Sequence, residues 1–156
     1  MRELAAEETN LLRPCLEALA AHHNQTSRFF KGTYPSAPYE KTLAAFRRSL
    51  QDGRSRIAVA EQGGRIVGFC KIDVEDGHGK LDYLVVQACC RGKGYGAALM
   101  EWALAAFARA DVREVEVKVA DGNDALSFYE RYGFRMNAHI LRRSESTRGE
   151  SSGAEE

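Results

Sequence analysis

The sequence lacks long apolar runs and any excess of charge of one sign. No apolar run approaches the roughly 20 residues that a membrane-spanning helix needs. The first ten residues are acidic, whereas a signal peptide begins with basic residues followed by apolar ones. We therefore expect a cytoplasmic protein with no membrane partner. Lysine plus arginine and aspartate plus glutamate both total 22, so the overall charge does not favour a nucleic-acid partner.

Cysteine is also scarce, and its spacing does not fit a metal site. The chain has four cysteines, at Cys15, Cys70, Cys89 and Cys90. They lack the CxxC spacing of zinc sites, and a reducing compartment would keep them as thiols. The adjacent pair Cys89 and Cys90 suggests redox chemistry, but we favour two small residues that fill a turn. No metal is expected.

The length of the chain sets the expected domain organisation. With 156 residues, of which 44% are hydrophobic, the chain is long enough for one domain with a sizeable core and short for two. We expect a single domain over residues 1–143. Residues 144–156 are small and polar and cannot bury a face, so we expect a disordered tail there.

The spacing of apolar residues changes near residue 55. Before it, helical spacing predicts two helices, at about residues 8–22 and 39–52. After it, the period is two, which is typical of strands. Three strands, which we expect to form an antiparallel meander with tight turns, cover residues 56–61, 65–75 and 81–86.

A single β-α-β unit is expected after the meander. The stretch AALMEWALAAFARA, which ends at residue 110, has no helix breaker and predicts a largely buried helix. The alternating valines of residues 115–119 predict a strand, and the helix-length gap before it suggests parallel pairing with the third strand. A short helix ended by Gly133 and a last strand over residues 134–143 complete the prediction.

Three glycines and two cations occupy residues 91–96, RGKGYG, between an expected strand and an expected helix. Unpaired N–H groups at the start of a helix, together with the helix dipole, favour a phosphate there. The glycines permit close approach, and Arg91 and Lys93 supply positive charge at the rim. The stretch fits neither Walker A nor the GxGxxG dinucleotide fingerprint. A plain connecting turn remains the alternative.

The segment LDYLVVQACCRGKGYGAALMEWALAAF resembles the acyl-CoA binding segment of the GNAT N-acetyltransferase superfamily. Its pattern Q/R-x-x-G-x-G/A is filled by Arg91, Gly94 and Gly96. A second family segment, AxxFYxxxGF, is filled by Ala125, Phe128, Tyr129, Gly133 and Phe134. The resemblance implies an α/β fold of the α+β type. Its central sheet would be mixed and mostly antiparallel, with a β-α-β acyl-CoA binding unit and flanking helices.

The resemblance also implies acetyl-CoA as co-substrate and assigns roles in binding it. Backbone N–H groups of Leu84, Val85 and Val86 would bind pantetheine and polarise the acetyl carbonyl. The diphosphate would be held by the glycine loop and the first helical turn, namely Arg91, Gly92, Lys93, Gly94, Tyr95, Gly96 and Ala97. Relatives often carry asparagine three residues before the motif alanine, whereas here Gly122 stands there. Asn123, one residue later, then either reaches the ligand, falls short of it or caps a helix.

Two residues carry the implied chemistry. Tyr129 resembles the family's general acid, because a phenol of pKa about 10 stays protonated at neutral pH and can protonate a thiolate. Asp82 stands where many relatives carry an acidic residue, and in a regular strand it shares a face with Leu84 and Val86. It would draw the amine proton through a water. Glu116 competes with Asp82 for this role, and plain solvation of either side chain also remains open.

The resemblance implies an N-acetyltransferase that moves an acetyl group directly to a primary amine of a small-molecule or peptide acceptor. Relatives often dimerise, so a homodimer is an open expectation. Three alternatives remain: another acyl-CoA donor, a non-catalytic CoA-binding or protein-interaction module on the same fold, and a nucleotide-phosphate binder unrelated to acyl transfer. The sequence does not indicate the acceptor.

Overall fold

The computed structural model describes residues 1–122 and 124–143. The chain divides into two compact units, Met1–Asp124 and Ala125–Glu156. Asn123 and the expected tail over residues 144–156 lie outside the described residues. The single domain over residues 1–143 therefore stays a prediction.

The described residues of the first unit form a five-stranded mixed sheet in the order β1-β2-β3-β4-β5. Neighbouring strands are antiparallel except β4 and β5, which are parallel. The strands are β1 (Arg2–Glu3), β2 (Ser55–Gln62), β3 (Arg65–Glu75), β4 (His78–Val86) and β5 (Glu114–Val117). The predicted meander and the predicted parallel pairing are confirmed, and so is the mixed, mostly antiparallel fold class.

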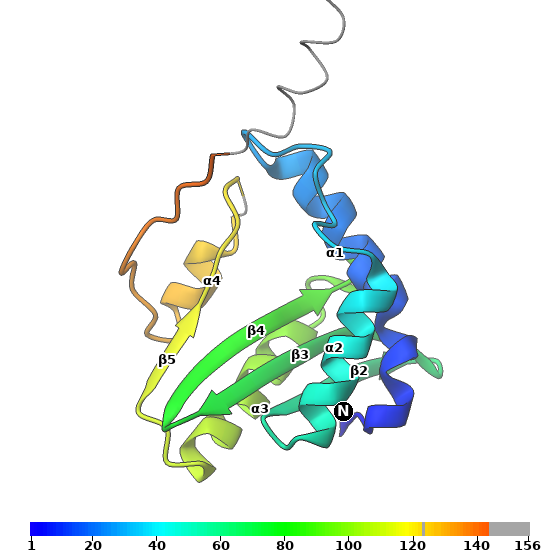
Figure 1. Ribbon diagram of the computed structural model, residues 1–156, viewed down its shortest axis with the longest axis vertical. Helices are drawn as coiled ribbons and strands as arrows, with labels where there is room; N and C mark the ends of the chain where they lie inside the picture. The colour runs from blue at the N-terminus through cyan, green and yellow to red at the C-terminus, as the bar shows by residue number, and fades with distance from the viewer. Residues whose placement is uncertain (123, 144–156) are drawn as a thin grey trace, which may run out of the picture. The chain divides into compact units, whose positions relative to one another are not determined.

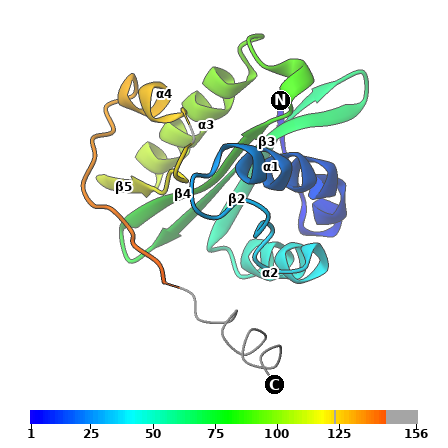
Figure 2. The ribbon, with the colours of Figure 1, turned by 90° about the horizontal axis from the view of Figure 1, so that it is seen from above.

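Helices cover both faces of this sheet (Figure 2). The helical segments of the unit are the 3-10 helix η1 (Ala6–Leu12), α1 (Arg13–Thr26), α2 (Tyr39–Gln51), the 3-10 turn η2 (Ala88–Cys90) and α3 (Tyr95–Arg109). The helices α1 and α2 lie on one face and α3 on the other. The first predicted helix is split, because its α-helical part begins only at Arg13. Pro14 lies in its first turn, where the missing N–H is tolerated.

Each face of the sheet buries its own set of apolar side chains. On the face covered by α1 and α2, Phe46 of α2 packs edge-on against Phe69 and Tyr83, with ring centroids 6.2 and 5.1 Å away. On the other face, α3 supplies aliphatic side chains and Phe107, which is 2% exposed. Each buried side chain of this size contributes about 1.5–3 kcal/mol relative to leaving it in water.

The ladder between β3 and β4 contains an irregularity. Lys71 is paired with Tyr83, but the next residue, Ile72, is paired with Leu81. Asp82 is therefore an extra residue in β4, as in a β-bulge. A bulge shifts the alternation of side chains between the two faces of the sheet. Residues of β4 before and after Asp82 therefore cannot be assigned to a face by one continuous alternation.

The second unit contains one short helix among its described residues, α4 (Leu126–Glu130). As predicted, the turn after it is closed at Gly133, which has a φ of +93° and donates its N–H to the carbonyl of Glu130 at 3.1 Å. The predicted last strand over residues 134–143 is wrong, since no ladder forms with it among the described residues. Alternating apolar residues make a strand only where a neighbour accepts and donates the backbone hydrogen bonds.

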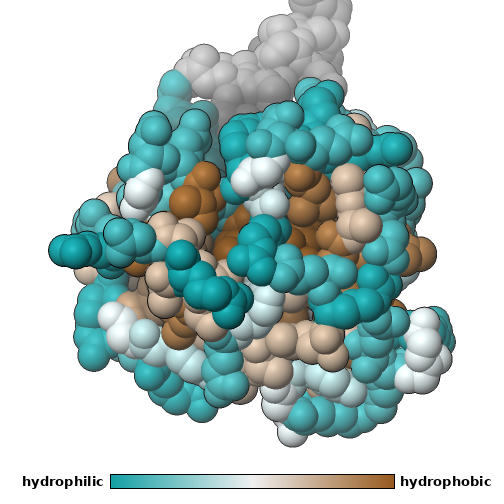
Figure 3. Space-filling model, turned by 90° about the horizontal axis from the view of Figure 1, so that it is seen from below, coloured by the Kyte–Doolittle hydropathy of each residue, from teal (hydrophilic) through white to brown (hydrophobic). Residues whose placement is uncertain are grey.

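The surface mixes polar and apolar side chains. On the face seen in Figure 3, hydrophilic side chains interrupt the apolar patches. Among the described residues, no helix is both long enough and apolar enough to cross a membrane.

Candidate functional site

The two parallel strands of the sheet separate halfway along β4. Pairing runs from His78 with Glu114 to Leu81 with Val117, where β5 ends, while β4 continues to Val86. Figure 1 shows the two strands side by side at their starts and diverging toward their carboxyl ends. We call His78–Leu81 the paired half of β4 and Asp82–Val86 the open half.

The open half is held on one edge only. On the β3 side, Leu84 is paired with Cys70 and Val86 with Gly68. On the other edge, no strand of the described residues continues the ladder. Backbone groups left without a neighbour can pair with an extended ligand that carries amides. Val85 is only 4% exposed, so its side chain serves the core, while its backbone lies on the edge that has no strand partner among the described residues.

The glycine loop ends at the start of α3. Gly94 is the N-cap of α3, with a φ of +87°, and no side chain caps this helix end among the described residues. The first helical hydrogen bond runs from the N–H of Ala98 to the carbonyl of Gly94 at 3.0 Å. The N–H groups before Ala98 therefore lie in the unpaired first turn, where an anion is favoured. A Cβ at Gly94 would meet nothing within 4 Å, so the space before the loop is open.

Arg91 connects the loop to the open half of β4. Its Nε donates a hydrogen bond of 3.1 Å to the carbonyl of Val86, the last residue of the strand. The unpaired strand edge and the helix N-terminus are thus consecutive parts of one structure. The residues expected to bind a diphosphate, Arg91 to Ala97, and those expected to bind its attached arm, Leu84 to Val86, lie in that order along it.

Asp82 does not share a face with Leu84 and Val86, and this expectation is corrected. Its Oδ2 accepts a hydrogen bond of 2.7 Å from Nζ of Lys71, which lies over the Phe46 ring of α2 at 5.1 Å. The carboxylate therefore lies on the face of α1 and α2, together with Tyr83. The bulge causes this, because Asp82 is the extra residue and the alternation restarts after it.

Lys71 is the functional candidate that the sequence analysis missed. It is 5% exposed, and its Nζ lies 2.7 Å from Asp73 Oδ1 as well as from Asp82 Oδ2. Ser55 donates a further hydrogen bond of 2.5 Å to Asp73. Burial, together with the negative charges of Asp82 and Asp73, raises the pKa of Tyr83. A lysine inside the apolar strand RIVGFCKIDVE was the available signal, since a buried charge requires partners.

Glu116, the competing candidate for the base, belongs to the paired half. It lies opposite Lys80 in the ladder, and its Oε2 is 3.7 Å from Nε2 of His78. Its side chain is 56% exposed. Asp82, in contrast, is the first residue of β4 beyond the last pair with β5, so it lies at the point where the strands part.

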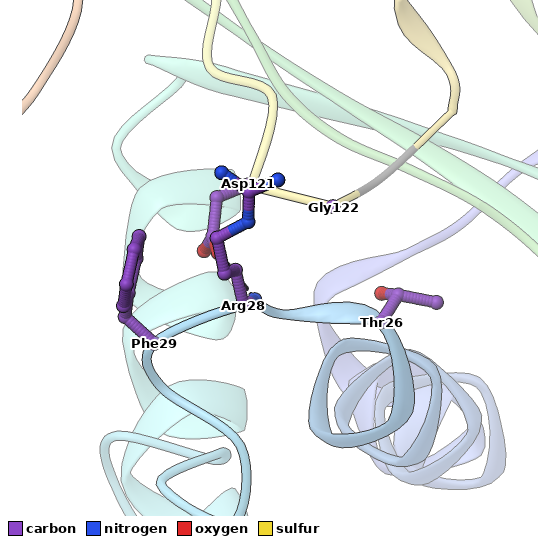
Figure 4. A pocket seen from close by; sticks show the side chains of 5 residues that line it. All are labelled: Thr26, Arg28, Phe29, Asp121 and Gly122. Carbon is purple, nitrogen blue, oxygen red and sulfur yellow. Dashed lines mark hydrogen bonds between the residues drawn. The ribbon is translucent and has the colours of Figure 1, made fainter.

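Beyond β5 the chain is attached to the end of α1. Asp121 accepts hydrogen bonds from the N–H of Arg28 at 2.6 Å and from the hydroxyl of Ser27 at 2.9 Å. These donors, Arg28 first, lower the pKa of Asp121. A Cβ at Gly122 would overlap the carbonyl oxygen of Thr26, so only glycine fits there. The junction borders a cleft of about 370 Å³, lined by Arg28 and Phe29 on one segment and Asp121 and Gly122 on the other (Figure 4).

Tyr129 lies in α4 of the second unit. It is buried, and its ring packs edge-on against Phe128 and Phe134 at centroid distances of 5.6 and 5.8 Å. The role expected for Tyr129 stays a prediction. The role expected for Asn123 concerns a residue outside the described part of the chain. Within that part, no three or more histidine, cysteine, aspartate or glutamate side chains form a group that could hold a metal ion.

Solved structures share this fold. A GCN5-related N-acetyltransferase from Ralstonia eutropha JMP134 is 20% identical, with 92% of this chain and 96% of that chain covered and a TM-score of 0.74. A predicted acetyltransferase from Clostridium acetobutylicum, solved with acetyl-CoA, is 15% identical, with coverages of 92% and 94% and a TM-score of 0.73. The PaiA N-acetyltransferase from Thermoplasma acidophilum, in complex with coenzyme A, is 18% identical, with coverages of 90% and 94% and a TM-score of 0.70. The fold is that of acetyltransferases.

The sequence itself assigns the family. The family model described as "Acetyltransferase (GNAT) domain" matches residues 18–144, which is most of the chain. The chain belongs to the GNAT acetyltransferase family.

Proposed function

We propose that the protein is an acetyl-CoA dependent N-acetyltransferase that passes the acetyl group directly to a primary amine of a small-molecule or peptide acceptor. One observation carries the proposal. The open half of β4 is followed, after Gln87 and the turn η2, by the glycine loop and the N-terminus of α3. An extended thioester arm and its diphosphate need these two features in this order.

The backbone does most of the binding in this proposal. Amides of the pantetheine arm pair with the free edge at Leu84–Val86, and an N–H of the same edge polarises the acetyl carbonyl. The diphosphate is held by the N–H groups at the start of α3 and by the positive charges of Arg91 and Lys93. The expected contact of Asn123 with the cofactor remains part of the proposal.

The transfer step needs a neutral amine and a protonated leaving group. The amine nitrogen attacks the thioester carbonyl, the carbon–sulfur bond breaks, and the thiolate takes a proton. We assign the proton donor to Tyr129, because it stands at the tyrosine of the family segment AxxFYxxxGF. A phenol keeps its proton at neutral pH and can give it to a more acidic thiol.

Asp82 is the better candidate for accepting the amine proton, through a water. It lies where β4 and β5 part, whereas Glu116 lies within the paired half beside His78. The ammonium groups of Lys71 and Lys80, at 2.7 and 3.5 Å, keep the carboxylate of Asp82 in place.

Calorimetry with acetyl-CoA on a matched pair of glycine variants tests the binding part of the proposal. Gly94 and Gly53 both have positive φ, +87° and +77°, and a Cβ at either would meet nothing within 4 Å. Alanine therefore costs similar strain at both, about 1 kcal/mol. We expect Gly94→Ala to weaken acetyl-CoA binding at least about tenfold, or about 1.4 kcal/mol, and Gly53→Ala to leave it unchanged. Equal affinities for the two variants would refute the loop as the diphosphate site.

Turnover of Tyr129→Phe tests the catalytic part. We expect the rate of acetyl transfer to fall about 100-fold while affinity for acetyl-CoA stays near normal, because the change removes only the hydroxyl group that would donate the proton. A screen of amines that follows the release of free CoA supplies the acceptor for this assay. Wild-type protein that binds acetyl-CoA but acetylates no amine would instead favour a non-catalytic CoA-binding module.

A further inference from the structure

Two neighbouring thiols lie directly before the glycine loop. Cys89 and Cys90 belong to the turn η2, and their Sγ atoms are 3.2 Å apart. Cys89 is exposed and Cys90 is 3% exposed. All four cysteines are free, but Cys15 and Cys70 are fully buried, and burial raises the pKa of Cys70 to about 12. The pair in η2 is therefore the reactive one, and filling a turn explains Cys90 but not Cys89.

The turn that holds this pair determines where the loop begins. The N–H of Cys90 donates a hydrogen bond of 2.9 Å to the carbonyl of Gln87. The N–H of Arg91 donates one of 3.4 Å to the carbonyl of Ala88. The thiol of Cys90 donates to Oε1 of Gln62 at the end of β2, at 3.2 Å. Arg91, the next residue, is attached to Val86. A change in the backbone of η2 therefore reaches both the loop and the end of the open half.

We propose that Cys89 and Cys90 form an oxidation site at which hydrogen peroxide closes a disulfide between them and thereby weakens the binding of acetyl-CoA. The proposal rests on the proposed function for its effect on binding, but not for the chemistry of the thiols. The thiolate of Cys89 attacks one peroxide oxygen, the other oxygen leaves as hydroxide, and a sulfenic acid forms. The sulfur of Cys90 then attacks the sulfur of Cys89 and releases water. The net reaction converts two thiols and one peroxide into one disulfide and two waters.

The order of these steps follows from exposure and hydrogen bonding. Cys89 meets the oxidant first, because Cys90 is shielded from solvent. The hydrogen bond with Cys89, and then burial, raise the pKa of Cys90. Cys90 is thus the second thiol, which resolves the sulfenic acid already formed beside it.

A disulfide between the adjacent residues Cys89 and Cys90 closes a small ring, and forming it must move the backbone. Adjacent Cα atoms are about 3.8 Å apart across a trans peptide, whereas disulfides usually join Cα atoms about 4.4–6.8 Å apart. The strain falls on η2 and its hydrogen bonds to Gln87 and Ala88. Strained disulfides are also reduced more easily than relaxed ones, so a thiol reductant restores the turn. The site is reversible.

Intact mass measurement after limited peroxide treatment tests the chemistry. We expect the wild-type protein to lose the mass of two hydrogens and the fragment containing Cys89 and Cys90 to resist alkylation until it is reduced. Cys89→Ser should lose no mass, and its exposed position makes a folding defect from this change small. A gain of two oxygens without a disulfide would overturn the proposal. A dimer linked through Cys89 on a non-reducing gel would do the same.

Calorimetry with acetyl-CoA on the same samples tests the consequence. We expect oxidised wild-type protein to bind about tenfold more weakly than reduced protein, with recovery after reduction. Cys89→Ser should bind like the reduced protein before and after peroxide. Unchanged affinity in a sample with a proven disulfide would refute the coupling to the loop while leaving the proposed function intact. Failure of reduced wild-type protein to bind acetyl-CoA would refute the proposed function. The intact-mass measurement would still test whether Cys89 and Cys90 form a disulfide.

Discussion

The two halves of β4 share one strand and one neighbour, β3, but they differ on the other edge. The paired half is closed by β5, and its residue Gly79 packs closely under Phe107 and Val112. The open half has no such neighbour among the described residues, and it leads through the turn η2 into the glycine loop. In the proposed function, this difference matters because a missing strand partner leaves backbone groups that can bind a ligand. The side chain of Val85 fills the core, and the proposed binding uses only the backbone of this half.

Lys71→Met should produce the largest effect, because it breaks the boundary between the two halves. The change leaves Asp73 and Asp82 without their buried cation, and removing one member of a buried pair typically costs about 3–5 kcal/mol. Lys80→Met is the matched control, since Lys80 approaches the same Asp82 at 3.5 Å from a more exposed position. We expect it to change the free energy of unfolding in urea by less than about 1 kcal/mol. Similar losses for both variants would contradict the importance of the buried cluster.

A pair of glycine-to-alanine changes compares the two halves directly. A Cβ at Gly68 would come 2.7 Å from the carbonyl oxygen of Val85 in the open half. A Cβ at Gly79 would come 2.8 Å from the side chains of Phe107 and Val112 in the paired half. We expect each change to cost about 1–3 kcal/mol in urea unfolding, as overpacking does.

Affinity for acetyl-CoA should separate this pair. Gly68→Ala displaces the backbone that we propose as the binding edge, so its affinity should fall several-fold, whereas Gly79→Ala should bind like the wild type at temperatures where both are folded. Calorimetry measures this directly. A larger loss of affinity in Gly79→Ala would mean that the paired half, and not the open half, carries the ligand.

Lys93→Met should have a smaller effect, confined to the loop that follows the open half. Lys93 is exposed, and its charge would meet the diphosphate at the rim, so we expect about a three- to tenfold loss of acetyl-CoA affinity. The loss should shrink as salt is added, because salt screens exposed charges. Lys41→Met on α2 serves as the control for a general change in net charge. An equal loss in both variants would remove Lys93 from the site.

The smallest effect should come from pH at the junction beyond β5. Hydrogen bonds from Arg28 and Ser27 lower the pKa of Asp121 in the folded protein. A lowered pKa stabilises the fold above the ordinary aspartate value of about 3.9, and the contribution is lost as the pH falls through the folded pKa. Asp121→Asn should therefore melt below the wild type at neutral pH, and the two melting temperatures should converge in acid. A difference that persists unchanged in acid would show that the carboxylate charge is not involved.

Much of the architecture followed from local patterns. The alternation from Arg56 onward predicted the antiparallel strands, and a helix-length gap before Val115 predicted the parallel pairing of β4 and β5. The loop at residues 91–96 was recognised because its glycines and its position before a helix are local properties. These features depend only on residues that are close together in the sequence, so they can be predicted without knowing the fold.

Features that depend on residues distant in the sequence were not predicted. Counting alternate residues put Asp82 on the wrong face, because a bulge depends on how β3 and β4 match and not on either strand alone. Lys71 was overlooked because one of its carboxylate partners, Asp82, comes beside it only through the pairing of β3 with β4. Residues 134–143 were predicted to form a last strand, although no partner strand for them lies among the described residues.

The length of the open half has a consequence for the choice of carrier. Its five residues, Asp82–Val86, extend about 16 Å at about 3.3 Å per residue. In the proposed function, the length of the open half thus sets the distance between the diphosphate, which is anchored beyond Val86, and the reacting carbon, which lies near Asp82. Short synthetic thioesters that lack the diphosphate would have no anchor to hold their acyl carbon at this distance. Selection among thioesters would then begin with the reach of the carrier, before the identity of the acyl group matters.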